Sequence, residues 1–338
     1  MNRAFLLTGV AVALSLTMGM GCLGDAPHDN PLDPNSDRFA TEGEVVGRVT
    51  DRAEAPLSEV EVRLILGTSV LQTELVTQTD AGGRFAMTAV PEGAGYRLLA
   101  SKDGYDVGLL EGIDIRAGVV EELGALRLNA LPAFTEATFR TVHISRWWPR
   151  NDLFFLEINA QVNDADGLFD IDAVVFEIPD FNFTIPLDPQ TAGRFEKSIR
   201  ADSLPTASLQ SLLGRTLRLT VRDMEGVVVR SAPRQLVRVV EDTPITTAPR
   251  ESMLLETGLP LFRWDPFPPR FPFTYRIDIF RDEANRAVLV RQISTIAMEE
   301  TSLQSRTPLP AGPYFWTVTV VDEFGNQSRS KEAAFRIP

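Results

Sequence analysis

Oxygen-bearing side chains gather in one short run of the sequence, "NDADGLFDID". The run supplies five candidate ligands for a calcium ion: Asn163, Asp164, Asp166, Asp170 and Asp172. Carboxylate and amide oxygens at close spacing are the ligands that Ca²⁺ takes in proteins. The EF-hand register does not fit, because a central Gly167 would put Val162 at the first ligand position and Ala173 at the last. Asp and Asn also bond their own backbone in plain acidic turns, so the sequence leaves a calcium site and such a turn both open. It predicts no other cofactor or metal.

The single cysteine, Cys22, is the second residue with distinctive chemistry. Arg3 begins a segment in which an apolar run over 4–16 leads to small residues directly before Cys22, as in a secretory signal. The apolar run is shorter than the roughly 20 residues that a membrane span needs. We therefore expect residues 1–21 to be a signal peptide.

The sequence around Cys22, "GMGC", resembles a bacterial lipobox, in which the cysteine is diacylated after cleavage. Gly21 fits that pattern, whereas Gly19 departs from it because the family prefers Leu three residues before the cysteine. The resemblance implies a lipid on Cys22, and Leu23 after it resembles an outer-membrane sorting signal. The alternative is an ordinary signal peptide with Cys22 as an unmodified thiol.

Other catalytic and binding chemistry finds little support. The chain has two histidines, His28 and His143, too few for a zinc site built from His and Cys. No G-x-S-x-G elbow or glycine-rich phosphate loop occurs, and His143 lies in a predicted strand. A net charge of −13 argues against nucleic acid as a partner. We expect no catalytic residues and no enzyme activity.

Adjacent tryptophans, Trp147 and Trp148, are candidates for ligand contact. Neighbouring residues of a strand point to opposite faces, so we expect one of the two rings to be exposed. An exposed indole can stack on a sugar or anchor a partner. Alternatively, one ring belongs to a core and the other covers a domain junction.

The elements that must position these residues are strands. Short alternating runs separated by Gly, Pro, Asn and Asp predict an all-β chain. After the signal peptide, residues 22–41 are rich in Pro and Asp and predict a disordered tether. Three consecutive β-sandwich domains are then expected, over 42–130, 131–242 and 243–338.

The first predicted domain contains "GRVTD", "APLSEVEVRL" and "TQTDAGGRFAMTAVPEGAGYRLLASKDGY". Together these stretches resemble the carboxypeptidase regulatory-like domain, a transthyretin-like sandwich. The resemblance is carried by Gly47, Asp51, Pro56, Leu57, Thr79, Asp80, Gly83, Phe85, Pro91, Gly93, Tyr96, Gly104 and Tyr105. Ala55 departs from it, since many members have Gly before the Pro. In carboxypeptidases this domain is not catalytic, so the resemblance implies a non-enzymatic module.

The second and third domains are predicted from alternation. Leu156, Ile158 and Val162 should share one buried face, and "SLPTASLQSLLG" should form a short helical turn that ends at Gly214. This layout resembles bacterial Ig-like domains. In the last domain, an early Trp264 and the late pair Tyr314 and Trp316 resemble a fibronectin type III sandwich.

These features together predict a non-enzymatic, lipid-anchored protein of the bacterial cell envelope that serves as a binding or spacer scaffold. Its expected partners are the membrane, reached through the N-terminal lipid, and an unidentified protein or glycan. The predicted location is the outer membrane, on either its periplasmic or its outer side. The alternative is a carbohydrate-binding surface protein or an accessory subunit of an envelope hydrolase.

Overall fold

The computed structural model describes residue 36 and residues 41–66, 73–147, 149–268, 270–284 and 286–338. The chain divides into two compact units. Unit 1 takes its described residues from 1–50, 56–100 and 108–126, and unit 2 comprises Asp51–Ala55, Ser101–Val107 and Arg127–Pro338. Cys22 and Trp148 lie outside the described residues, as do the predicted signal peptide and all but residues 36 and 41 of the tether.

Unit 1 is built from two sheets. The first has the order β4 (Arg84–Pro91), β1 (Glu42–Thr50), β7 (Val120–Arg127), and the second has the order β3 (Thr73–Gln78), β2 (Glu61–Leu66), β5 (Gly93–Ser101), β6 (Gly108–Ile115). Alternation along the strands buries one face of each, so that Val62 and Leu64 of β2 are fully buried, as is Tyr96 of β5.

The turn between β3 and β4 shows why the sequence places glycine there. The carboxylate of Asp80 accepts hydrogen bonds from the backbone N–H groups of Gly82 (2.8 Å) and Arg84 (2.9 Å). Gly83 has φ +71°, and a Cβ at this position would lie 2.4 Å from the carbonyl oxygen of Val49. Only glycine meets both demands.

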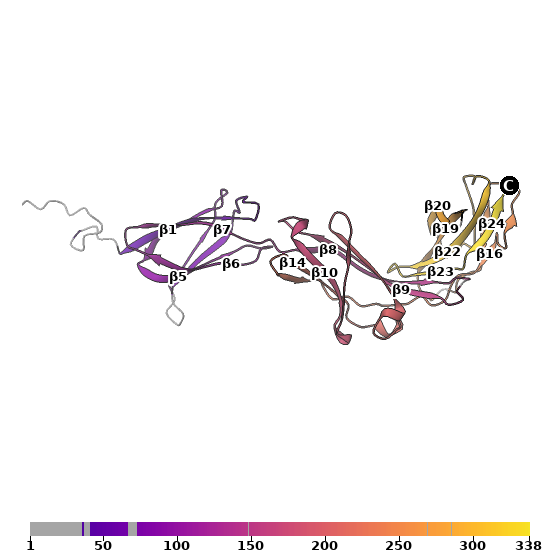
Figure 1. Cartoon of the computed structure of the whole chain (residues 1–338), viewed down its shortest axis with the longest axis horizontal. Helices are drawn as coiled ribbons and strands as arrows, with labels where there is room; N and C mark the ends of the chain where they lie inside the picture. Colours follow the sequence, from indigo (N-terminus) through magenta and orange to yellow (C-terminus); the bar gives the residue numbers. More distant parts are fainter. Residues whose placement is uncertain (1–35, 37–40, 67–72, 148, 269, 285) are drawn as a thin grey trace, which may run out of the picture. The chain divides into compact units, whose positions relative to one another are not determined.

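Unit 2 is dominated by one ten-stranded sheet (Figure 1). Eight of its strands follow one another in the order β12 (Asp188–Pro189), β13 (Arg194–Arg200), β9 (Leu153–Asn163), β8 (Ala133–Ile144), β23 (Gln327–Arg329), β22 (Gly312–Asp322), β19 (Phe273–Glu283), β20 (Arg286–Ile296). The other two strands branch from β22: β24 (Ala333–Ile337) pairs with β22, and β17 (Met253–Leu254) pairs with β24. The centre of this sheet is a parallel pair, in which Val142, His143 and Ile144 of β8 lie opposite Gln327, Ser328 and Arg329 of β23. Strands far apart in the sequence thus form a continuous sheet.

Two smaller sheets complete unit 2. One has the order β11 (Phe183–Pro186), β10 (Ile171–Ile178), β14 (Arg218–Asp223), β15 (Val228–Arg230), and the other β16 (Thr246–Ala248), β18 (Leu261–Trp264), β21 (Ser302–Gln304). Four single-turn 3₁₀ helices occur in the described residues: η1 (Leu168–Asp170), η2 (Pro179–Phe181), η3 (Ala201–Ser203) and η4 (Gln210–Leu212). Of these, η4 is the helical turn predicted before Gly214, whose φ is +72°. No helix in the described part of the chain is long and apolar enough to span a membrane.

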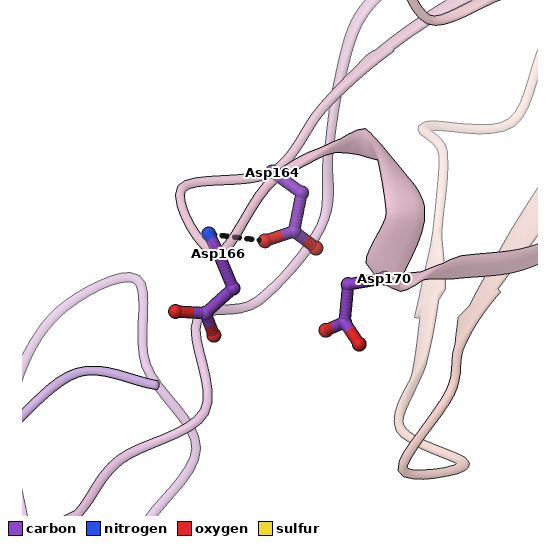
Figure 2. Close-up of side chains that lie close together, drawn as sticks. All are labelled: Asp164, Asp166 and Asp170. Carbon is purple, nitrogen blue, oxygen red and sulfur yellow. Dashed lines mark hydrogen bonds between the residues drawn. The ribbon is translucent and has the colours of Figure 1, made fainter. Parts of the chain in front are cut away.

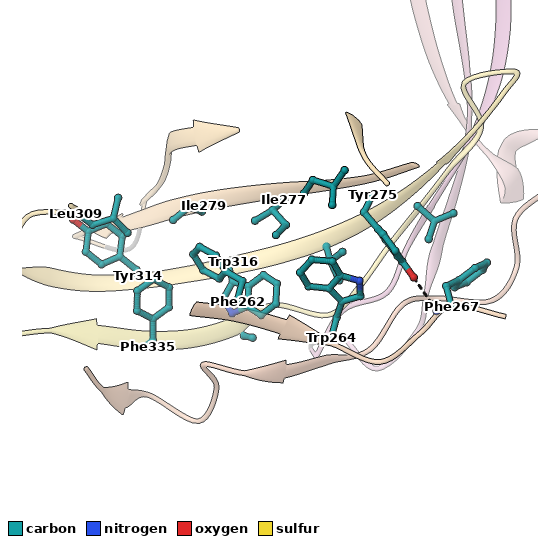
Figure 3. Close-up of a cluster of buried hydrophobic side chains, with 14 of the residues drawn as sticks. Phe262, Trp264, Phe267, Tyr275, Ile277, Ile279, Leu309, Tyr314, Trp316 and Phe335 are labelled. Carbon is teal, nitrogen blue, oxygen red and sulfur yellow. Dashed lines mark hydrogen bonds between the residues drawn. The ribbon is translucent and has the colours of Figure 1, made fainter. Parts of the chain in front are cut away.

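Two hydrophobic clusters fill unit 2. One lies within 156–236 and includes Leu156, Ile158 and Val162 of β9. The other lies within 240–337 and is rich in aromatic rings, among them Trp264 and Trp316 (Figure 3). The tyrosine hydroxyl of Tyr275 accepts a hydrogen bond from the backbone N–H of Phe267 (2.8 Å), so the proline-rich loop after β18 is fastened to this core.

The observed elements confirm the all-β prediction and the predicted buried face of β9. Trp264 and Trp316 lie in the core. The domain boundaries at 42, 131 and 243 stay predictions.

Candidate functional site

The acidic run lies in the loop between β9 and β10. The carboxylate of Asp164 accepts the backbone N–H of Asp166 (2.9 Å), and Gly167 donates its N–H to the carbonyl of Asp164 (3.2 Å). Gly167 has φ +105°, in the region that glycine favours. The chain then makes the single turn of η1, which ends at Asp170. Asp164 therefore does form the aspartate turn that the sequence allowed.

This loop geometry brings three carboxylates together. One oxygen from each of Asp164, Asp166 and Asp170 lies within 4.8 Å of the others, and Figure 2 shows the three side chains on one short loop. Asp164 and Asp170 are each only 6% exposed. Asp166 is half-buried, and its two oxygens accept backbone N–H groups of Arg52 (3.4 Å) and Ala130 (2.6 Å).

Some oxygens of this group have no hydrogen-bond partner. One carboxylate oxygen of Asp164 (Oδ2) and one of Asp170 (Oδ2) are buried and accept no hydrogen bond from any described residue. The same holds for the amide oxygen of Asn129, whose Nδ2 donates to the buried carboxylate of Asp223 (2.7 Å). Buried polar atoms are nearly always paired, so three unpaired oxygens in one neighbourhood need an explanation such as an ion or water.

The electrostatics of the loop are dominated by negative charge. Burial raises the pKa of Asp164, and the charges of Asp170, Asp166 and Asp223 raise it further, against the hydrogen bond from the Asp166 backbone. The guanidinium of Arg52 is hydrogen-bonded to Asp170 and lies 3.6 Å from Glu225. An arrangement of hard oxygen atoms with excess negative charge can hold a hard cation.

Two of the five predicted ligands lie elsewhere. Asp172 points to Arg222 and forms an ion pair with it (2.6 Å), outside the group of three carboxylates. Asn163 is exposed at the end of β9, opposite Ala133 of β8. Sequence reasoning missed Arg52, Asn129 and Asp223, because they reach the loop from segments distant in the chain and no local spacing signals them.

Trp147 lies in a bend beyond the end of β8, so the assumption that it belongs to the strand is wrong. Its ring is 62% exposed, its Nε1 donates to the carbonyl of Glu332 (2.7 Å), and the ammonium of Lys331 lies 4.6 Å from the ring centroid. Together with Thr246 and Phe315, the ring lines a groove of about 880 Å³. The indole is thus held in place, with an open groove beside it.

His143 is a buried strand residue, as predicted. Its Nε2 lies 3.0 Å from the carboxylate of Asp152, its Nδ1 lies 3.2 Å from the hydroxyl of Ser328, and its ring stacks on Phe154. The Ser328 side chain is fully buried and donates to the carbonyl of Asp242 (2.7 Å). This serine–histidine–aspartate set therefore fastens β8 to β23 and presents no accessible nucleophile.

Comparison with protein families finds a match for the first part of the chain. Residues 44–129 match the carboxypeptidase regulatory-like domain. The match confirms the resemblance seen in the sequence and covers the strands from β1 to β7.

Several solved structures resemble the chain at low identity. The major pilin subunit BcpA of Bacillus cereus aligns with 88% of this chain and 98% of its own, at 10% identity and a TM-score of 0.32. Fibronectin(III)-like modules of CbhA from Clostridium thermocellum align with 61% of this chain and 93% of theirs, at 12% identity and a TM-score of 0.29. A DUF3823 family protein from Parabacteroides merdae aligns with 58% of this chain and 99% of its own, at 15% identity and a TM-score of 0.26. No curated protein matches the sequence.

Proposed function

We propose that the protein is a non-enzymatic scaffold of the bacterial cell envelope, anchored by a lipid on Cys22 and serving to hold a binding surface away from the membrane. The observation that carries the proposal is the continuous sheet of unit 2, in which β8 and β23 pair directly. A spacer has to resist bending, and strands hydrogen-bonded across a junction leave no free hinge there.

Side chains reinforce this pairing. The amide oxygen of Asn326 accepts both the backbone N–H (2.8 Å) and the hydroxyl (3.1 Å) of Thr141 on β8. Arg238 bonds Asp322 (3.0 Å) and Glu323 (3.0 Å) in the turn between β22 and β23. The buried bonds between Asn326 and Thr141 are of the kind that rigidifies a junction, and the partly exposed pairs of Arg238 add to them.

The anchor can be tested in bacterial cells that express the full chain. An alkynyl palmitate analogue should label the protein, and the label should be lost in Cys22→Ser, which should also leave the membrane fraction. Ser15→Ala, a change within the predicted signal, is the matched control and should still be labelled. A Cys22→Ser protein that stays in the membrane at the same processed size would refute the anchor.

The exposed ring of Trp147 beside its groove favours a second candidate function, carbohydrate binding at the cell surface or in support of an envelope hydrolase. Aromatic faces stack on sugar rings, and the hydrogen bond to Glu332 fixes this one in place. A glycan array probed with the protein should show binding that Trp147→Ala removes and Phe169→Ala, at a fully exposed ring elsewhere, retains. An array without binding, or equal binding by both variants, counts against this function.

A further inference from the structure

We propose that the loop between β9 and β10 is a calcium site, with Asp164, Asp166 and Asp170 as its carboxylate ligands. The proposal does not depend on lipid anchoring or on scaffold function.

The spacing of the oxygens fits the ion. Ca²⁺ binds oxygen at 2.3–2.6 Å, so ligands on opposite sides of the ion are about 4.6–5.2 Å apart and all others are closer. The three carboxylate oxygens lie within 4.8 Å of one another. Mg²⁺ demands nearly ideal octahedral geometry and gives up its water ligands reluctantly, so a site built from protein oxygens favours Ca²⁺.

The unpaired oxygens supply the independent reason for a ligand. Asp164 and Asp170 are more than nine-tenths buried, and each keeps one oxygen that accepts nothing from the described residues. Asp170 uses its other oxygen for Arg52, and Asp164 uses its other oxygen for the backbone of Asp166. The two free oxygens can therefore bind a cation without breaking any bond that shapes the loop.

The excess negative charge around the loop also favours binding of a cation. Asp223 adds a fourth carboxylate, buried and bonded to Asn129. Among the described residues, the guanidinium of Arg52 is hydrogen-bonded to Asp170, one of the three carboxylates, and it also lies near Glu225. A divalent ion would offset charge that one shared guanidinium leaves uncompensated.

The donor set indicates the class of metal and its affinity. The ligand atoms are all oxygens, which favours hard ions over zinc or copper. Three carboxylates, one of them half-buried, correspond to the weaker calcium modules, with Kd of about 10⁻⁴–10⁻³ M.

The test compares two single substitutions in the full chain, purified in detergent and treated with EDTA. Asp164→Asn keeps an amide oxygen that can accept the N–H of Asp166, so the loop should fold, but it removes a ligand charge. Asp172→Asn lies two residues beyond Asp170 and faces Arg222, outside the carboxylate group. It is therefore the matched control.

In wild type and Asp172→Asn, 10 mM CaCl₂ should raise Tm by about 3 to 8 °C, and calorimetric titration with CaCl₂ should show one site. MgCl₂ at the same concentration should produce less than a third of that shift. Asp164→Asn should lose at least four-fifths of the calcium shift while melting, without metal, at or above the wild-type temperature.

Three results would overturn the proposal: no calcium shift in wild type, an unchanged shift in Asp164→Asn, or equal loss in both variants. Terbium luminescence provides a second readout, because Tyr105 pairs with Ala130, whose backbone N–H donates to the carboxylate of Asp166 (2.6 Å). Sensitised emission from Tb³⁺ should appear in wild type, fall on addition of CaCl₂ and be absent from Asp164→Asn. Emission that CaCl₂ does not displace would also contradict the site.

Discussion

The turn that begins at Asp322 and the loop that begins at Asp164 use the same residue in the same way, yet they leave its carboxylate in different states. In both, one oxygen accepts a backbone N–H two residues ahead, from Phe324 (2.9 Å) or from Asp166 (2.9 Å). The second oxygen of Asp322 accepts bonds from Arg238 and from the amide of Asn326, each at 3.0 Å. The second oxygen of Asp164 accepts nothing from the described residues.

This difference separates an aspartate whose two oxygens are both paired from one that keeps a free acceptor, as the proposed calcium site requires. Both residues are buried, at 5% and 6% exposure, so burial alone does not distinguish them. The number of filled acceptor positions does, because an ionised carboxylate in a protein interior is stable only when its oxygens are paired. Both oxygens of Asp322 have partners, whereas one oxygen of Asp164 has none among the described residues.

The largest effect should come from Asp322→Ala. It removes acceptors for two turn N–H groups and for Arg238, and it leaves those donors partly buried, so we expect a loss of about 3–4 kcal/mol in unfolding free energy. Urea unfolding followed by tryptophan fluorescence measures it. Glu323→Ala, at the exposed partner of Arg238, should leave the midpoint almost unchanged. Equal effects from both variants would show that the carboxylate of Asp322 is not the centre of the turn.

Next in size is Asn326→Ala. Its amide oxygen accepts two hydrogen bonds from Thr141, and without it the buried N–H of Thr141 has no acceptor. The expected loss is about 2–3 kcal/mol. Hydrogen exchange should show faster exchange at Thr141 while β13, at the other side of β9, stays protected. Unchanged exchange at Thr141 would mean that the turn after β22 does not hold β8.

Replacing Asp164 and Asp322 by asparagine should change the stability of the protein in opposite directions. Because burial and like charges raise the pKa of Asp164, the stability linked to its protonated form is present at low pH and is lost as pH rises through the folded pKa. At pH 7 without metal, Asp164→Asn should therefore stabilise the protein. Asp322→Asn should destabilise it by about 1–2 kcal/mol, since it weakens the bond to Arg238. Thermal melting of both variants in EDTA measures these changes. If both variants melt above the wild type, or both below it, the two aspartates do not differ in the way described.

The smallest expected effect is a change in calcium affinity on substitution of Arg52. Its guanidinium repels a cation bound beside Asp170, so Arg52→Gln should tighten calcium binding about threefold. Calorimetric titration measures the change, and Arg222→Gln, whose guanidinium faces Asp172, is the control that should leave Kd unaltered. Weaker binding in Arg52→Gln would place the ion away from Asp170.

Much of the architecture could be predicted because alternation along a strand is a local property. The buried faces of β9 and β22, and the aspartate turn after β9, follow from residues within ten positions of one another. The position of Trp147 could not be predicted in this way. β8 ends at Ile144, and the ring of Trp147 is exposed because it lies in the bend that follows, where the alternation of a strand no longer applies.

The remaining features depend on contacts across long separations in the sequence. Arg52 meets Asp170 over 118 residues, and Asn129 meets Asp223 over 94. No pattern in a single sequence signals such pairs, since the turns that carry them are brought together only by the packed sheets. The negative charge of the candidate calcium site was therefore predictable from the sequence, whereas the distant residues that surround it were not.

The parallel pair of β8 and β23 also implies an order of events during synthesis. Thr141 and Asn326 are 185 residues apart, so β8 can pair with β9 long before its other edge meets β23. Until then the edge exposes unpaired N–H and C=O groups, which in other chains template aggregation. Contacts of such high sequence separation form slowly, so the half-made molecule should depend on chaperones more than the finished one does.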